Sequence, residues 1–237
     1  MNQAISEAFS AGSDPYRGRA QEPLDASPLS VPYNGQTRMR LSINSGLSSA
    51  RARIDPNAEH LVAVHYSGAS LPELRVAGGE VRVGWPAWSI ADWLRAVFSG
   101  HHGGVEIVLH PAVAWELVVR GGLASVDGDF AAGTVTRIEV SGGCSNVEIR
   151  LPKPEHTVPI RISGGASQLC LRRPAEVAVS VAVSGGVASI RLDDRSFDAI
   201  GGSARLETSR LVPGLPGYDV VVCGGASNVE VESFDSL

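Results

Sequence analysis

The sequence lacks the features that mark several large classes of protein. It has no run of about 18 apolar residues, the length that a membrane-spanning helix needs, and no basic block in a chain of formal net charge −5. We therefore expect no transmembrane segment, and neither nucleic acid nor an anionic membrane as the main partner. The N-terminus lacks a basic start followed by an apolar run, which predicts a cytoplasmic protein without a secretion signal. Cell-surface display would need another export route.

Cysteine, histidine and aromatic residues are also scarce. Three cysteines, Cys144, Cys170 and Cys223, have neither the even number nor the spacing of a disulfide framework or a metal site. Nothing near His101, His102 and His110 completes a zinc site, so we expect no metal and no cofactor. Aromatic residues make up 5% of the chain against 43% hydrophobic residues. This combination indicates a narrow core of small aliphatic side chains.

The sequence is rich in one repeated stretch, VSGGCSNVEIRL, which begins at Val140. It recurs as ISGGASQLCLRR from Ile162, VSGGVASIRLDD from Val183 and VCGGASNVEVES from Val222. The first glycines of the Gly-Gly pairs, at 121, 142, 164, 185, 201 and 224, are 21, 22, 21, 16 and 23 residues apart. A period in this range is typical of stacked supersecondary units.

Each copy predicts two strands joined by a corner. Apolar positions alternate on even numbers before the glycines (Ile138, Val140) and on odd numbers after them (Val147, Ile149). Because side chains alternate strictly along a strand, the chain must bend at Gly142. A phosphate-binding loop would need a helix after the glycines, whereas a strand pattern follows every pair. The predicted corner glycines are Gly121, Gly122, Gly142, Gly143, Gly164, Gly165, Gly185, Gly186, Gly224 and Gly225.

Units of this kind bury their apolar faces only by stacking, which predicts an all-β, parallel β-solenoid with coils of about 21 residues. We expect residues 36–237 to form one solenoid domain, with irregular first coils or a cap at 36–84. Residues 1–35 predict a flexible tail, because they are rich in Ser, Ala, Pro and Gly and have little periodicity.

Residues 85–102 interrupt the strand pattern and predict a short inserted helix. Ser89 and Asp92 have capping-box spacing, and an apolar stripe follows them. A helix of about three turns is too short to be stable alone, so it must pack on this chain or on a partner. The candidate partner-binding residues are Trp85, Trp88, Trp93, Leu94 and Phe98.

Aligning the copies on their glycines places charged residues in two outward rows, which we interpret as a solvated face. One row is predicted to hold Asp127, Glu148, Cys170, Arg191, Glu207 and Glu230, and the other Asp129, Arg150, Arg172, Asp193 and Glu232. The densest candidate for catalysis, Asp193-Asp194-Arg195 with His156, has the composition of an ordinary turn. We therefore expect no catalytic residues.

With INSGLSSARARI from Ile43, VRGGLASVDG from Val119 and the later SGG-small-Ser copies, residues 36–237 resemble the putative-adhesin family of bacterial β-solenoids. This resemblance implies a right-handed parallel solenoid without known catalytic residues. The bactofilin-like cytoskeletal solenoids are a more distant likeness that suggests end-to-end polymerisation.

The sequence thus predicts a protein that is not an enzyme but a protein-interaction or scaffold module, with an unidentified protein partner. Self-association into a homo-oligomer through the terminal coils is a second hypothesis. Glu230, Glu232 and Asp235, in the predicted last coil, resemble edge-protecting charges and weigh against it. The third hypothesis is a protein that binds or acts on polysaccharides.

Overall fold

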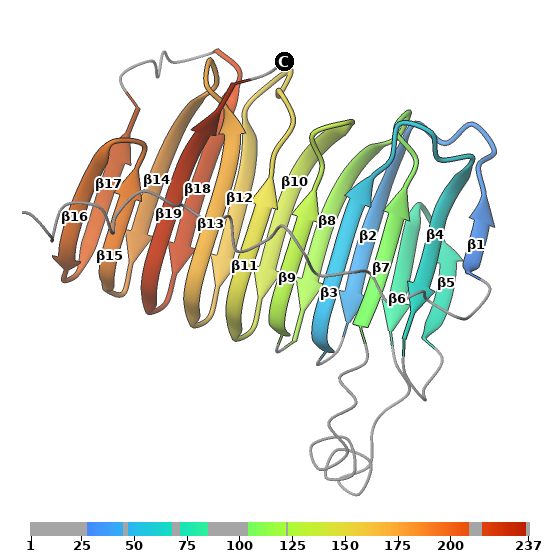
Figure 1. Cartoon of the computed structure of the whole chain (residues 1–237), viewed down its shortest axis with the longest axis horizontal. Helices are drawn as coiled ribbons and strands as arrows, with labels where there is room; N and C mark the ends of the chain where they lie inside the picture. Colours follow the sequence, from blue (N-terminus) through green and yellow to red (C-terminus); the bar gives the residue numbers. More distant parts are fainter. Residues whose placement is uncertain are drawn as a thin grey trace, which may run out of the picture.

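The computed structural model of the chain describes residues 28–44, 47–67, 72–84, 104–121, 123–208 and 215–235. Every regular element in these ranges is a β-strand, which confirms the predicted all-β class (Figure 1). The same ranges contain no helix long and apolar enough to cross a bilayer. The helix predicted at 85–102 lies outside the described residues, as do residues 1–27 of the predicted tail.

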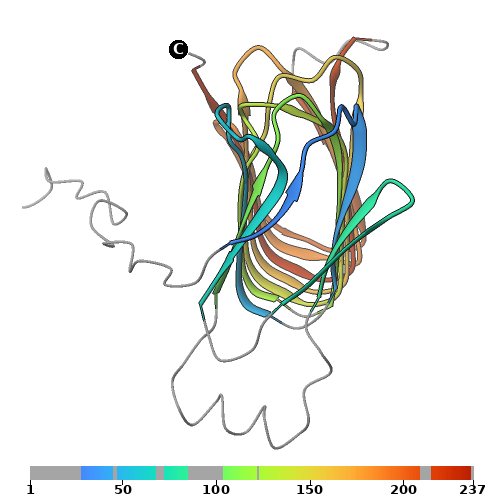
Figure 2. The same cartoon turned by 90° about the vertical axis from the view of Figure 1, so that its right-hand side faces the viewer.

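The strands form two sheets that face each other across one core (Figure 2). In spatial order, sheet A contains β1 (Leu29–Pro32), β4 (His60–Tyr66), β7 (Gly104–Leu109), β3 (Leu47–Ile54), β9 (Leu123–Asp129), β11 (Cys144–Arg150), β13 (Ala166–Pro174), β19 (Ala226–Phe234), β15 (Val187–Leu192) and β16 (Arg195–Ile200). Sheet B contains β17 (Ser203–Glu207), β14 (Ala178–Ser184), β18 (Gly217–Cys223), β12 (Val158–Ser163), β10 (Thr134–Ser141), β8 (Ala114–Arg120), β2 (Arg38–Asn44), β6 (Glu80–Gly84) and β5 (Glu73–Ala77).

The chain passes from a strand of sheet B to a strand of sheet A, and we call two such consecutive strands a strand pair. Strand pairs β2/β3, β8/β9, β10/β11, β12/β13, β18/β19 and β14/β15 stack in parallel. Antiparallel pairing is confined to the two ends of the stack, at β1–β4, β4–β7 and β5–β6 and at β14–β17 and β15–β16.

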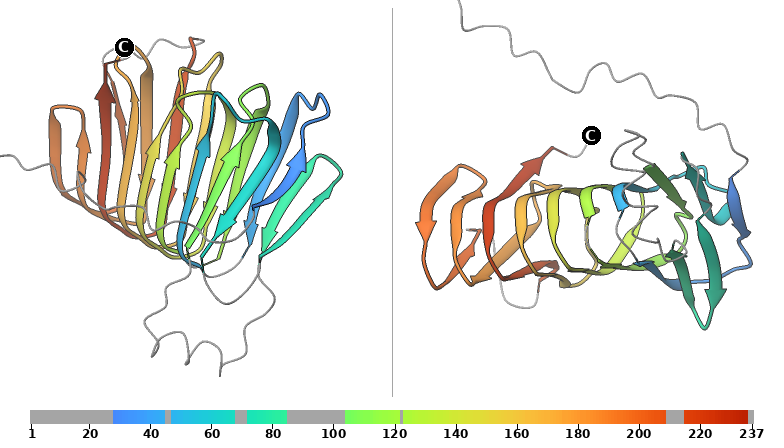
Figure 3. Two further views of the ribbon diagram at one scale, coloured as in Figure 1. Left: turned by 45° about the vertical axis from the view of Figure 1, so that its right-hand side comes forward. Right: turned by 90° about the horizontal axis from the view of Figure 1, so that it is seen from below.

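The spatial order of the strand pairs differs from their order in the sequence. The last pair, β18/β19, lies between β12/β13 and β14/β15, and β2/β3 lies between β8/β9 and β6/β7 (Figures 1 and 3). Glu230 and Glu232 in β19 therefore lie inside sheet A and do not protect an edge, which corrects the sequence interpretation. The edges at this end are β16 and β17.

The first strand begins within the segment predicted as a tail. Residues 29–32 form β1, which pairs antiparallel with β4, and Leu29 and Val31 pack against the core. Sheet A thus starts at Leu29 rather than at residue 36. Two alternating apolar residues gave too short a pattern to distinguish this strand from the Pro- and Ser-rich segment around it.

The glycine corners stack directly on one another. Gly142 has a φ of 116°, which L side chains rarely adopt, and a Cβ placed on it would lie 2.5 Å from the carbonyl oxygen of Gly121. The amide of Gly142 donates to the carbonyl oxygen of Ser163 in the neighbouring strand pair, β12/β13 (N···O 3.0 Å). A Cβ on Gly143, in contrast, would meet no heavy atom within 4 Å. The first glycine of the pair is therefore required by the stack, and the second has open space beside it.

The core consists almost entirely of aliphatic side chains that alternate along the strands, as the parity pattern predicts. Val140 before the corner and Val147 after it are both buried. Small residues on β3 and β9, among them Ala52 and Gly128, leave an apolar cavity of about 30 Å³. Its lining offers no polar partner for a water molecule, so it is a packing defect rather than a ligand site.

Two polar groups lie buried at the margin of this core. The hydroxyl of Tyr218 donates to the carbonyl oxygen of Pro152 (2.5 Å), and burial raises the pKa of Tyr218. The side chain of Arg173 is 3% exposed, and its Nη2 donates to Asp193 Oδ2 (2.6 Å) while Nη1 donates to the carbonyl oxygen of Pro174 (3.1 Å). This pair joins β13 to the turn after β15, on the two sides of β19.

Candidate interaction surface

The partner-binding residues predicted from the sequence cannot be placed on this fold. Trp85, Trp88, Trp93, Leu94 and Phe98 all lie outside the described residues. Their role as a docking helix stays a prediction.

The histidines have ordinary surroundings where they are described. The ring of His110 stacks on Tyr33, with centroids 3.8 Å apart, and its Nδ1 accepts from the amide of Ala112 (3.2 Å). His101 and His102 fall outside the described ranges. Among the residues that the structure describes, no group of three His, Cys, Asp or Glu side chains could hold a metal ion.

The outward face of sheet A carries three rows of side chains. Each row runs across the strands, with one residue per layer, at a spacing of about 4.8 Å. The middle row is Arg51, Asp127, Glu148, Cys170, Glu230 and Arg191. The upper row, farther from the glycine corner, is Arg53, Asp129, Arg150, Arg172 and Glu232.

The structure agrees with most of the rows that the sequence predicts and corrects two positions, Glu207 and Asp193. Glu207 lies in β17 of sheet B, opposite Ser180, and not on this face. The glycine alignment misplaced Glu207 because the copy at Gly201 does not form a further parallel strand pair. It joins β16, the edge of sheet A, to β17, the edge of sheet B, and each of these strands is antiparallel to its neighbour. Asp193 follows β15, has a φ of 53° and binds Arg173.

Arginines neutralise the carboxylates of the two charged rows. Arg51 binds Asp127 (2.9 Å), and Arg172 lies 3.2 Å from Glu148 and 3.6 Å from Glu232. Most of these pairs are about half exposed, so each contributes little to stability. The face thus presents paired charges without a single-sign field.

At one margin of the face, Arg53 binds two carboxylates, Asp55 (2.5 Å) and Glu106 (2.9 Å). The Arg53 guanidinium, with the amide of Asn57, holds the pKa of Asp55 below its ordinary value.

Cys170 lies in the centre of the middle row, between the strands that carry Glu148 and Glu230. Partial burial is the main cause that raises the pKa of its thiol, although Arg172 opposes the shift. A raised pKa keeps the sulfur protonated and a weak nucleophile. The position suits a small filler of the sheet surface rather than a reactive cysteine.

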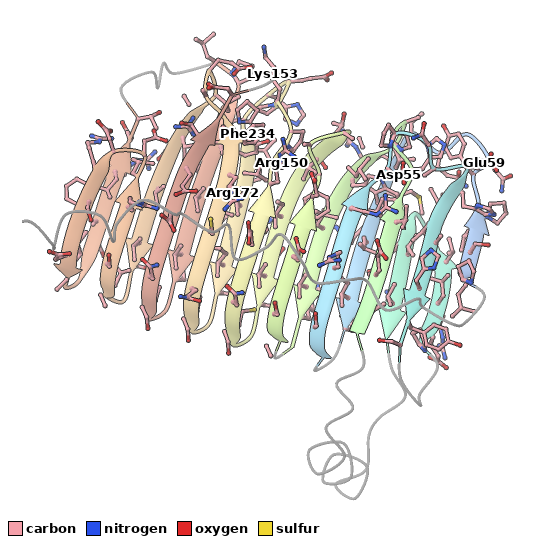
Figure 4. The ribbon with its side chains drawn as sticks, viewed as in Figure 1. Asp55, Glu59, Arg150, Lys153, Arg172 and Phe234 are labelled. Atoms are coloured by element: carbon pink, nitrogen blue, oxygen red, sulfur yellow. The ribbon has the colours of Figure 1, made fainter. Side chains whose placement is uncertain are left out.

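An aromatic ring lies near the end of the upper row. The guanidinium of Arg150 is 4.5 Å from the ring centroid of Phe234. Arg172 lies on the same face, and Lys153 lies in the loop that follows β11 (Figure 4). Asp129 and Glu176 lie 3.8 Å from Arg150 and 3.5 Å from Lys153, respectively.

The third row was missed from the sequence. Beside the glycine corner it carries only uncharged hydrogen-bonding side chains: Ser49, Ser125, Asn146, Gln168, Asn228 and Ser189. A regular signal for it existed, because five of these residues follow the first glycine of their copy by four positions. We call this set the uncharged row.

Of the candidate residues for catalysis, Asp193 and Asp194 form the turn between β15 and β16, and Arg195 is the first residue of β16. Asp193 is bound to buried Arg173, and Arg195 donates to the carbonyl oxygen of Glu207. Both side chains therefore hold the end of the stack together.

Comparisons with known proteins show the fold alone. No protein-family model matches the sequence, and no curated protein does so. A solved structure described as "a putative cell adhesion protein from Clostridium sporogenes" is similar, with a TM-score of 0.64 and 15% sequence identity. The match covers 88% of this chain and 98% of that one.

Proposed function

We propose that this chain is a right-handed parallel β-solenoid that acts as a non-catalytic protein-interaction or scaffold module. Its binding surface is the outward face of sheet A. The observation that carries this proposal is the uncharged row, which runs beside the neutralised charged rows on a rigid sheet.

Such a face suits a protein partner for two reasons. The uncharged row crosses six strands, a length of about 24 Å at the strand spacing of a sheet. Its hydroxyl and amide groups can replace their hydrogen bonds to water by hydrogen bonds to a partner. The charged side chains beside this row already have ion-pair partners, and they keep these partners when the face is covered. The similar solved structure is described as "a putative cell adhesion protein", which supports an interaction module.

A test of this proposal blocks the face without disturbing the core. Gln168 is an exposed residue of the uncharged row on β13, and Arg161 is exposed on β12 of the same strand pair but faces outward from sheet B. Gln168→Trp should abolish the enrichment of cross-linked proteins from extracts of the native host, and Arg161→Trp should leave it unchanged. Equal enrichment by wild type and Gln168→Trp would contradict the proposal.

A polysaccharide ligand is the second candidate. Asn146, Gln168 and Asn228 place three amide side chains in adjacent layers, a spacing at which they could bind successive sugar hydroxyl groups. Binding on a glycan panel that Gln168→Trp removes, together with no protein enrichment by wild type, would favour this candidate.

A further inference from the structure

The two ends of the stack have unpaired strand edges. Sheet B ends in β17 at one end and in β5 at the other, and sheet A ends in β16 and β1. Within the described ranges, each end strand is bonded to one neighbouring strand only, so one side of its backbone lacks a strand partner there. Such edges are templates for pairing with another chain unless side chains prevent it.

The core also reaches both ends of sheet B. Leu206 of β17 lies opposite buried Val181 and is only partly buried. Val76 of β5 lies opposite buried Val81, yet Val76 itself is 43% exposed. Both residues lie on the core-facing side of their strands. Each end of sheet B therefore leaves apolar surface that an additional strand would cover.

The two edge strands match in length and direction. β17 and β5 have five residues each, and each is antiparallel to a strand of the common parallel set in sheet B. β17 of one copy and β5 of another can therefore pair in parallel and continue sheet B.

The outward charges of these strands are complementary in one register. On β17, Arg205 and Glu207 form an ion pair (2.8 Å), and on β5, Arg75 and Glu73 form another (3.0 Å). When Arg205 faces Glu73 of the second copy, Glu207 faces Arg75. Leu206 then faces Leu74, which continues the core across the junction. We propose that the chain associates head to tail with a second copy of itself through β17 and β5.

A proline at the edge of sheet A makes sheet B the main contributor to the junction. Pro32 in β1 lacks the amide proton that a strand partner on sheet A would require. On β17, the carbonyl oxygen of Glu207 already accepts from Arg195, which removes one backbone acceptor from the junction. A contact of two five-residue strands is small, so association is weak and concentration-dependent. Because the two surfaces lie at opposite ends of the stack, successive copies add in line and form linear oligomers.

Charge reversal on single ends tests the junction. The R205E/E207R and E73R/R75E variants each keep the ion pair within their own strand. R205E also loses the longer contact of Arg205 with Asp219 (3.9 Å), so urea unfolding checks that each variant is folded. Each variant alone places like charges opposite one another and should associate about tenfold more weakly than wild type, as measured by sedimentation velocity from micromolar to millimolar concentration.

A mixture of the two variants supplies the decisive control. In alternating order every junction is complementary again, so the mixture should recover the wild-type association, as should the chain with all four reversals. A strictly monomeric wild type, or a mixture that associates no better than its components, would overturn the proposal. The result does not depend on the face of sheet A, since Gln168→Trp leaves both ends unchanged.

Discussion

At the scale of single residues, the two glycines of a corner have different physical roles. The first has a positive φ and contacts the backbone of the neighbouring layer, whereas the second at Gly143, Gly165 and Gly225 has open space. The sequence shows both as equal members of a repeated pair. Only the stacked structure separates them, because the close approach is made by a residue that is distant in the sequence: 21 positions away for Gly142, 22 for Gly164 and 60 for Gly224.

Replacing each glycine of one pair by alanine tests this difference. Gly142→Ala should lower the free energy of unfolding by more than about 2 kcal/mol, because alanine is strained at this φ and its Cβ overlaps Gly121. Gly143→Ala should change it by less than about 1 kcal/mol. Urea unfolding measures both, and equal losses would contradict the assignment of the close contact to Gly142.

Acid stability depends on Glu80. The Arg82 guanidinium and the Ser42 hydroxyl, which donates at 2.5 Å, hold the pKa of Glu80 below its ordinary value of 4.5. As the pH falls, the unfolded chain therefore takes up this proton first. The stabilisation by the carboxylate is present above about pH 4.5 and is lost as the pH falls through the folded-state pKa.

Glu80→Gln should accordingly destabilise the protein at neutral pH, by no more than about 1 kcal/mol because the Arg82 guanidinium is exposed to solvent. The difference from wild type should shrink below about pH 4.5, where the wild-type carboxylate is protonated as well. Chemical unfolding at a series of pH values measures this difference. A difference that stays constant with pH would argue against the ion-pair cause.

At the scale of elements, the intercalated pair β18/β19 connects the end of the stack to its body. β14 and β15 pair with β18 and β19 on one side and with the edge strands β17 and β16 on the other. Residues 178–207 therefore contact the rest of the stack through β18/β19, the last strand pair of the chain.

A core truncation in β19 tests this dependence. Val229→Ala removes buried methyl groups and should cost about 2 kcal/mol. By hydrogen exchange, amides of residues 178–207 should lose protection together with those of β18/β19, although they carry no substitution. Unchanged protection in 178–207 would show that this unit packs on the body by another route.

The sequence predicts the strands and corners because these depend on local alternation and on glycine. Val140 and Val147 reveal the parity switch without any knowledge of their neighbours in space. The spatial order of the strand pairs cannot be predicted in this way. Near-identical copies such as those at Gly142, Gly164 and Gly224 can each stack on any of the others. The short interval before Gly201 marks the irregular end, but it does not specify that the last strand pair of the chain lies inside that end.

At the scale of the whole molecule, the strand order determines which surfaces are available. It places Glu230 in the middle row of sheet A between Cys170 and Arg191, and it makes β16 and β17 the edges at this end. Both the proposed binding face and the head-to-tail junction therefore rest on the intercalation of β18/β19.

A disulfide measures this order most directly. In a Cys144→Ala, Cys223→Ser background, Glu230→Cys places a thiol in register with Cys170 on the adjacent strand, about 4.8 Å away between Cα atoms. Arg191→Cys places it one strand farther, at about twice that distance and beyond the reach of a disulfide. Mild oxidation of the folded monomer should cross-link the Glu230→Cys protein and leave the Arg191→Cys protein reduced. The opposite result would put β15 beside β13 and contradict the intercalated order.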